Sequence, residues 1–201
     1  MNIPFESILT KEFLDKHLQT KSNVWFNTPL EKYFTFSSKT QGALGESFVT
    51  EYMIKKGHIV NERKNSGHDA IIDNYKTEIK FTLCRSDTPD KGVTINHLSL
   101  QKDFERCIIF IMNRNEENCR FLWFSKEDLH ILIQQEIFKH QQGGKKLGLD
   151  DYMCSGKDVK RLIQHHLAKG YNEWSMYKTT STKDTQLETY RTPNLNQWLE
   201  N

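Results

Sequence analysis

The sequence predicts an α/β fold in three layers, with a mixed central β-sheet of about five strands flanked by helices. Three observations lead to this prediction. Five short segments with strand character lie between residues 58 and 125, and helical patterns precede and follow them. Residues 107–113, CIIFIMN, form a continuous apolar run that is typical of a buried central strand. Two of the segments are separated only by a tight turn, which predicts an antiparallel hairpin.

The size and composition of the chain fit one domain. It has 201 residues, of which 36% are hydrophobic and 27% are charged, so it can bury a core without staples. No apolar run approaches the roughly 18–20 residues that span a bilayer, and residues 1–13 lack a basic-then-apolar leader. The four cysteines form no CxxC pair. We therefore expect free thiols, no zinc ribbon and a cytoplasmic protein without a membrane partner.

Helices are predicted in the first part of the chain. Apolar residues recur at helical spacing in residues 5–14, and residues 19–40 are irregular. Residues 42–57, GALGESFVTEYMIKKG, predict a second helix because their apolar residues form a stripe. The glycine at position 57 can end this helix.

The strand candidates lie in the middle of the chain. Residues 76–83, KTEIKFTL, alternate so that isoleucine, phenylalanine and leucine point to one face and the charged residues to the other. The preceding dipeptide, Asn74-Tyr75, is the predicted hairpin turn. The five candidates are residues 58–62, 69–73, 76–83, 107–113 and 119–125.

The C-terminal third combines helices with a long loop. Ser125 is a good N-cap for a helix over residues 126–138, and a second capped helix is predicted over residues 155–170. Residues 139–156 between them are polar and contain four glycines. This segment is longer than an ordinary connector, and its length favours a functional loop over a plain connection. A disordered polar loop is the alternative.

The charge is unevenly distributed along the chain. The net charge is only +2, but residues 139–191 carry ten Lys or Arg against six Asp or Glu, a balance of +4. Residues 1–138 carry eighteen against nineteen, a balance of −1. A basic surface can bind a phosphate backbone, and a solvated face is the equal alternative.

Three charged residues interrupt the two hairpin strands. Glu78 and Lys80 lie on one face of the second strand, roughly 6.5–7 Å apart. The predicted turn brings Asp69, which begins the first strand, near Lys80. Two converging carboxylates repel each other unless a divalent cation lies between them, and oxygen ligands select Mg²⁺ or Mn²⁺. With a lysine to orient or deprotonate a water, this set is suited to phosphodiester hydrolysis. The alternative is an exposed hairpin with a Glu–Lys pair.

The same residues resemble a known family. GHDAII followed by TEIKFTL is similar to the core motif of the PD-(D/E)XK nuclease superfamily, which includes most type II restriction endonucleases. Asp69, Glu78 and Lys80 match position by position, with eight residues between the carboxylates. Many members carry a further glutamate on the preceding helix, where this chain has Glu46. His68 stands where the motif name has proline, at a tolerant position. The resemblance covers residues 41–125.

The resemblance implies a restriction-endonuclease-like fold and a Mg²⁺-dependent, site-specific endonuclease that acts on double-stranded DNA. Residues 1–201 would form one nuclease domain, with the catalytic core at about 41–125 and the basic region at about 139–191 contacting DNA. Asp69 and Glu78 would hold Mg²⁺, or Mn²⁺ in its place, with the carbonyl of Ile79 as a third ligand. Lys80 would position or activate the water, and Glu46 would help through the metal or a water. One site for two DNA strands implies a homodimer or a partner subunit.

Further polar residues are candidates for contacts to nucleic acid. Glutamine can pair bidentately with adenine, lysine can contact guanine or phosphate, and the amides that open a helix can bind phosphate. An exposed turn, a disordered loop or an ordinary helix start would explain the same residues without DNA. The candidates are Gln101, Lys102, His140, Gln141, Gln142, Lys145, Lys146 and Lys157.

Two other functions use the same fold. One is a structure-selective or repair nuclease that nicks DNA, and the other is a module that binds DNA without cutting it. The complete set of two acids and a lysine argues against the pure binding module, because such a module gains nothing from repelling carboxylates.

Overall fold

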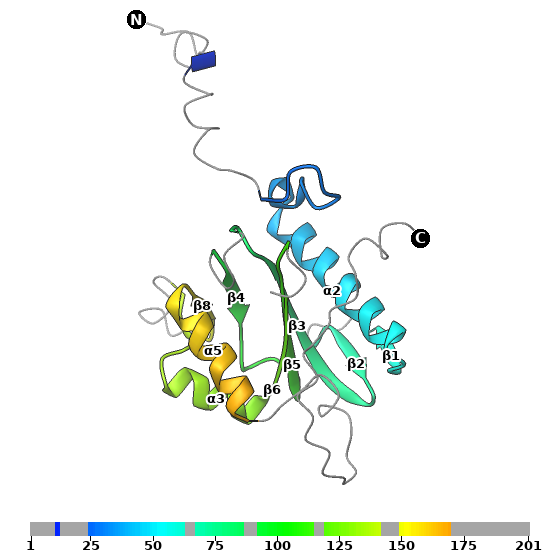
Figure 1. Cartoon of the computed structure of the whole chain (residues 1–201). Helices are drawn as coiled ribbons and strands as arrows, with labels where there is room; N and C mark the ends of the chain where they lie inside the picture. Colours follow the sequence, from blue (N-terminus) through cyan, green and yellow to red (C-terminus); the bar gives the residue numbers. More distant parts are fainter. Residues whose placement is uncertain are drawn as a thin grey trace, which may run out of the picture.

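The computed structural model describes residues 11–12, 24–62, 67–86, 92–114, 119–141 and 149–169 (Figure 1). The predicted first helix lies mostly outside these described residues. Within them the chain forms a five-stranded mixed sheet, a separate three-stranded sheet and helices, so the predicted α/β fold class is confirmed. No helix within the described ranges is both long and apolar enough to cross a membrane.

The larger sheet contains all five predicted strands, in the order β1-β2-β3-β5-β6. Strands β3 and β5 run parallel, and the other neighbours are antiparallel, which makes the sheet mixed. The strands are β1 (Val60–Glu62), β2 (Ala70–Ile72), β3 (Tyr75–Leu83), β5 (Arg106–Met112) and β6 (Arg120–Ser125).

The core of the molecule lies on both faces of this sheet, which accounts for the continuous apolar run of β5. Ile108 and Phe110 pack in one cluster with helix α2 (Ser38–Lys55), whereas Ile109 and Ile111 pack in the other. The second cluster includes buried residues of α3 (Lys126–Gln134), α5 (Lys157–Ala168) and the smaller sheet. Figure 1 shows α2 on one side of the sheet and α3 and α5 on the other. The fold therefore has three layers.

Helix α2 lies unusually close to β3 because it carries a glycine at the contact. A Cβ atom added to Gly45 would stand 2.3 Å from the Cβ of Phe81, so any side chain there would push the helix away. Ser37 caps the start of α2 by accepting a hydrogen bond from the backbone N–H of Thr40. The close packing fixes the position of the next residue, Glu46, beside β3.

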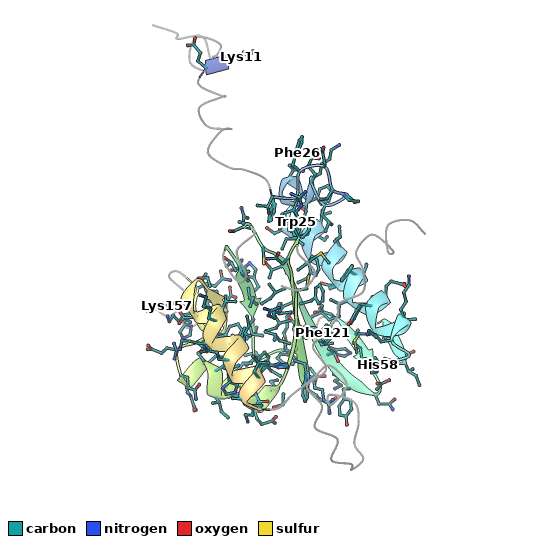
Figure 2. The ribbon with its side chains drawn as sticks, in the orientation of Figure 1. Lys11, Trp25, Phe26, His58, Phe121 and Lys157 are labelled. Carbon is teal, nitrogen blue, oxygen red and sulfur yellow. The ribbon has the colours of Figure 1, made fainter. Side chains whose placement is uncertain are left out.

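The segment before α2 is largely irregular, as predicted, and includes the short 3-10 helix η2 (Tyr33–Thr35). Trp25, labelled in Figure 2, is fully buried and donates its Nε1–H to the carbonyl oxygen of Cys84, at 2.8 Å. This bond ties the segment to the end of β3. The four cysteines are buried free thiols, which confirms the expectation from their spacing.

The hairpin turn lies one residue earlier than predicted. Asp73 and Asn74 form it, with φ angles of 48° and 72°, and Tyr75 already belongs to β3. Aspartate and asparagine tolerate this left-handed conformation, which the turn type requires at both positions, better than tyrosine does. Ala70 therefore pairs with Thr77, so Asp69 lies level with Glu78 rather than with Lys80.

The long predicted loop at residues 139–156 is not wholly irregular. Its ends form β7 (Lys139–His140) and β8 (Tyr152–Ser155), which join β4 (Thr94–Leu98) in a sheet of order β4-β8-β7. At α3 the predicted cap is confirmed, since Ser125 and Asp128 form a capping box. At α5 the N-cap is Gly156, which offers no side-chain cap.

Candidate active site

Five charged side chains from four segments converge at the middle of β3. Glu46 comes from α2, Asp69 precedes β2, Glu78 and Lys80 lie on β3, and Lys102 follows β4. We refer to these five residues as the acid–lysine cluster. The hairpin alone brings Asp69 and Glu78 together, whereas Glu46 and Lys102 depend on the packing of α2 and of the β4–β5 connection.

Glu78 is the centre of the acid–lysine cluster. It is fully buried, and its Oε1 accepts hydrogen bonds from the Nζ atoms of Lys80 and Lys102, each at 2.7 Å. Its Oε2 is also buried but has no hydrogen-bond partner among the described residues. Burying a carboxylate oxygen without a hydrogen-bond partner costs free energy. A ligand that binds this oxygen would recover that cost, which favours its binding.

The second carboxylate is oriented by the strand beside it. Oδ2 of Asp69 accepts a hydrogen bond from the backbone N–H of Ile79, at 2.7 Å. Burial and then the charge of Glu78 raise the pKa of Asp69. Partial burial, followed by the charges of Asp69 and Glu78, likewise raises the pKa of Glu46. The carboxylates therefore repel one another, and a cation would relieve that repulsion.

Lys102 is held in the acid–lysine cluster by charge. Burial acts to lower its pKa, but the hydrogen bond to Glu78 and the charges of the three carboxylates together outweigh burial, so that the pKa is raised. The backbone around Lys102 is fixed from two sides. Lys126 donates to its carbonyl oxygen at 2.7 Å, and Asp150 accepts from both the Ser99 hydroxyl and the Gln101 amide at 2.7 Å.

The donor set of the cluster fits Mg²⁺. Within the described part of the chain, no three His, Cys, Asp or Glu side chains are placed to hold one metal ion. Mg²⁺ does not require three, because it is commonly held by one or two carboxylates, with waters and substrate phosphates completing its shell. Asp69 and Glu78 supply two hard oxygen donors, and Oε2 of Glu78 is available.

The other predicted contact residues lie apart from the cluster. Gln101 is exposed, and its backbone N–H donates a hydrogen bond to the carboxylate of Asp150. His140 packs against Tyr152, with the ring centroids 4.6 Å apart, and the side chain of Gln141 contacts His97 at 3.2 Å. Lys157 begins α5, away from α2 (Figure 2). The remaining predicted residues, Gln142, Lys145 and Lys146, lie outside the described residues.

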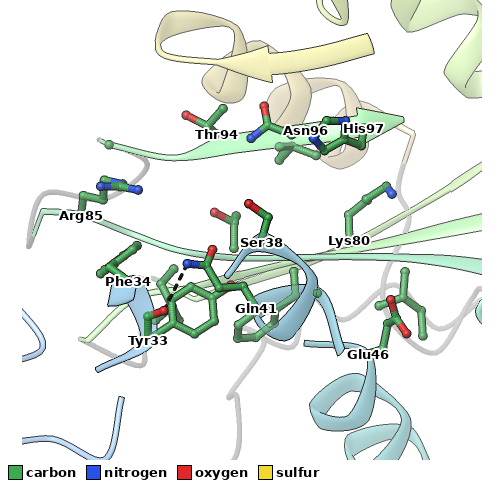
Figure 3. A pocket seen from close by; sticks show the side chains of 17 residues that line it. Tyr33, Phe34, Ser38, Gln41, Glu46, Lys80, Arg85, Thr94, Asn96 and His97 are labelled. Carbon is green, nitrogen blue, oxygen red and sulfur yellow. Dashed lines mark hydrogen bonds between the residues drawn. The ribbon is translucent and has the colours of Figure 1, made fainter. Parts of the chain in front are cut away.

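A cleft with a volume of about 430 Å³ adjoins the acid–lysine cluster (Figure 3). Glu46 and Lys80 line it together with residues that the sequence reasoning did not select, including Arg85, Asn96 and His97. No local pattern marks these three residues as a group, because they meet only where β4 packs beside β3.

No protein-family model matches the chain, and no curated protein matches it either. The chemistry of the acid–lysine cluster is therefore inferred from its own residues and their geometry.

Proposed function

We propose that this chain is a Mg²⁺-dependent endodeoxyribonuclease of the PD-(D/E)XK type, which hydrolyses phosphodiester bonds of double-stranded DNA at specific sites. One observation carries the proposal. Asp69, Glu78 and Lys80 converge on one hairpin, and a buried oxygen of Glu78 is left without a partner. A structural ion pair has no need of an open carboxylate oxygen, whereas a cation site does.

Each residue of the acid–lysine cluster has a role in this proposal. Asp69 and Glu78 would hold Mg²⁺, with the Ile79 carbonyl as a third ligand. When bound, the cation would supply an activated water and stabilise the negative charge on the phosphate. Lys80, fixed by its bond to Glu78, would orient that water. Glu46 would bind the same water.

Lys102 would serve as a second positive charge. Its ammonium group donates to the same Glu78 oxygen as that of Lys80. Two ammonium groups therefore lie beside the position proposed for the phosphate. Positive groups fixed before the reaction stabilise the charge that develops on the phosphate. The acids alone would repel the DNA, and the lysines and the cation offset that repulsion.

Site specificity and double-strand cleavage are part of the proposal. The basic region at about 139–191 would supply base contacts, through Gln141 and the neighbouring segment. One cluster in the chain would cut one strand, so cleavage of both strands would need a homodimer or a partner subunit.

Incubation with supercoiled plasmid DNA tests the proposal. Discrete linear fragments that appear with Mg²⁺ and disappear with EDTA are expected for the restriction type. Nicked circles alone would favour a repair-type nickase or a single subunit. Tight, metal-independent binding without cleavage would favour the module that binds without cutting.

The variant Lys80→Ala links cleavage to the acid–lysine cluster. It should lose cleavage while DNA binding, measured by fluorescence anisotropy, is largely kept. Lys55→Ala on the exposed surface of α2 is the matched control for loss of one positive charge and should cleave normally. A fully active Lys80→Ala protein would contradict the proposed mechanism.

A further inference from the structure

The cleft beside the acid–lysine cluster has an unusual floor. Strand β2 pairs with β3 only at Tyr75–Thr77, and β5 occupies the opposite edge of β3. Among the described strands, none pairs with the remaining β3 edge, where Ile79–Leu83 line the cleft. Figure 3 shows α2 on one side of this edge and β4 on the other. The cleft is thus a slot along an open strand edge.

The walls of the slot carry neutral hydrogen-bonding groups. Thr94 and Asn96 stand at alternate, exposed positions of β4, so both point from the same face of the strand. On the α2 side, the amide nitrogen of Gln41 is fixed by the carbonyl oxygens of Tyr33 and Phe36, at 3.2 and 3.0 Å. Carboxamides and hydroxyls are the groups that bind the polar edges of nucleobases.

The two ends of the slot carry positive charge. Lys80 lies at the end formed by the acid–lysine cluster, and Arg85 lies at the other (Figure 3). The guanidinium of Arg85 is held over the ring of Phe34, 4.4 Å from the ring centroid. Of the described residues that line the slot, Glu46 alone is acidic, and it belongs to the cluster. This distribution favours a ligand with negative charges at both ends and a polar, uncharged middle.

The size of the slot limits what can enter. Its volume of about 430 Å³ lies within the range of pockets that bind small organic ligands. One nucleotide is a ligand of that size. A DNA duplex is far too wide, since its major groove alone is about 12 Å across. Only a strand separated from its complement can therefore reach the floor of the slot.

We propose that the slot binds one unpaired nucleotide of the cleaved strand, next to the scissile phosphate. The inference rests on the proposed nuclease function, because the phosphate to be cut is placed at Lys80. The base lies between α2 and β4, where Gln41 and Asn96 meet its edge, and Arg85 binds the next phosphate along the strand. The nucleotide enters the slot from a duplex that is locally unpaired at the cut or from which the nucleotide is extruded.

A binding experiment that involves no cleavage tests this inference. The full chain is titrated, with Ca²⁺ in place of Mg²⁺, against a fluorescein-labelled duplex and against the same duplex with one central bulged nucleotide. Wild type should bind the bulged duplex more tightly. Arg85→Ala and Asn96→Ala should each weaken that binding at least about fivefold and change binding to the intact duplex less than about twofold. Lys55→Ala should alter neither.

Several results would overturn the inference. Wild type could bind both duplexes equally, or the two variants could lose affinity for both equally, as expected of a general phosphate contact. If an extended peptide bound the slot and the bulged duplex did not, the open β3 edge would be assigned to a protein strand instead.

The nuclease function is judged separately, by plasmid cleavage in Mg²⁺. A protein that cleaves plasmid without preferring the bulged duplex would overturn the slot and leave the nuclease. A protein that prefers the bulged duplex but cleaves no DNA would overturn the nuclease and support the slot as a binding site.

Discussion

Glu78 and Asp158 are both buried carboxylates that meet two cationic side chains, but the two sites are built differently. Both lysines of the first site bind one oxygen of Glu78, and the other oxygen has no partner. At the second site, Lys139 binds one oxygen of Asp158 and Arg161 binds the other. Each of the two carboxylates meets two cationic side chains, but the hydrogen bonds are distributed differently over its two oxygens. That distribution distinguishes a site open to a ligand from an ion pair complete in itself.

The pKa of a carboxyl group is shifted in opposite directions in the two regions. Burial acts to raise the pKa of Asp158, but the hydrogen bonds and the charges of Lys139 and Arg161 together outweigh burial, so the pKa is lowered. Beside Glu78, burial and carboxylate repulsion raise the pKa of Asp69. Ionisation of Asp158 therefore favours the folded state, and ionisation of Asp69 opposes it.

The largest expected effect comes from Glu78→Gln. The neutral amide removes the charge that gathers both lysines, and it replaces a carboxylate ligand of the proposed cation with a weaker, uncharged one. We expect plasmid cleavage to slow by at least about 100-fold. Asp158→Asn should leave the rate of cleavage unchanged, and so should the control Glu51→Gln on the exposed face of α2. Equal rates for the Glu78 and Asp158 variants would erase the distinction between the two regions.

Gly45→Ala tests whether the first region depends on helix placement. The added methyl would overlap Phe81, so α2 must shift and carry Glu46 with it. We expect the free energy of unfolding to fall by about 1–3 kcal/mol, measured with urea, together with slower cleavage.

Gly42→Ala is the matched control on the same helix. Its Cβ would meet only Glu46 Oε1, at 3.9 Å, so the better helix former should stabilise the protein by up to about 1 kcal/mol. If both alanine variants were stabilised, the close contact between α2 and β3 would not matter.

Asp158→Asn should affect stability rather than cleavage. The partners Lys139 and Arg161 are 49% and 47% exposed, so solvent screens the pair and the expected loss is about 1 kcal/mol at pH 7. Because the folded pKa lies below the ordinary value of 3.8, this contribution is complete above that value and is lost as the pH falls through the folded pKa. Urea unfolding at neutral and acidic pH measures the difference, and a stabilised variant at pH 7 would contradict it.

Asp69→Asn should give the smallest effect on the free energy of unfolding, with the opposite sign. The folded pKa is raised, so wild type loses stability as the pH rises from 3.8 through the folded pKa. The variant avoids that loss and still accepts the Ile79 hydrogen bond through its amide oxygen. We expect a gain of less than about 1 kcal/mol at pH 7 that vanishes in acid.

Mg²⁺ should reverse the order of stability of these two proteins. It should raise the thermal unfolding midpoint of wild type at pH 7, and should do so much less for Asp69→Asn. An equal response of the two proteins to Mg²⁺ would remove Asp69 from the proposed metal site.

Much of the larger sheet was predictable because its signals are local. Each of its five strands spans only a few residues, and alternation or a continuous apolar run marks them in the sequence. The turn was placed one residue late because Asn74 can occupy either turn position, and only the pairing of Ala70 with Thr77 decides between them. The smaller sheet was missed because β4 and β8 are short and far apart along the chain.

The sequence by itself determined which charged residues share a face of β3, since alternation along a strand depends on nothing beyond the strand. It also placed Asp69 one hairpin away. The tertiary structure alone decided that Lys102 joins Lys80 on one oxygen of Glu78, that the other oxygen stays open, and that a slot adjoins the cluster. These features depend on contacts between distant segments, such as the approach of α2 that Gly45 permits, and such contacts leave no periodic pattern in the sequence.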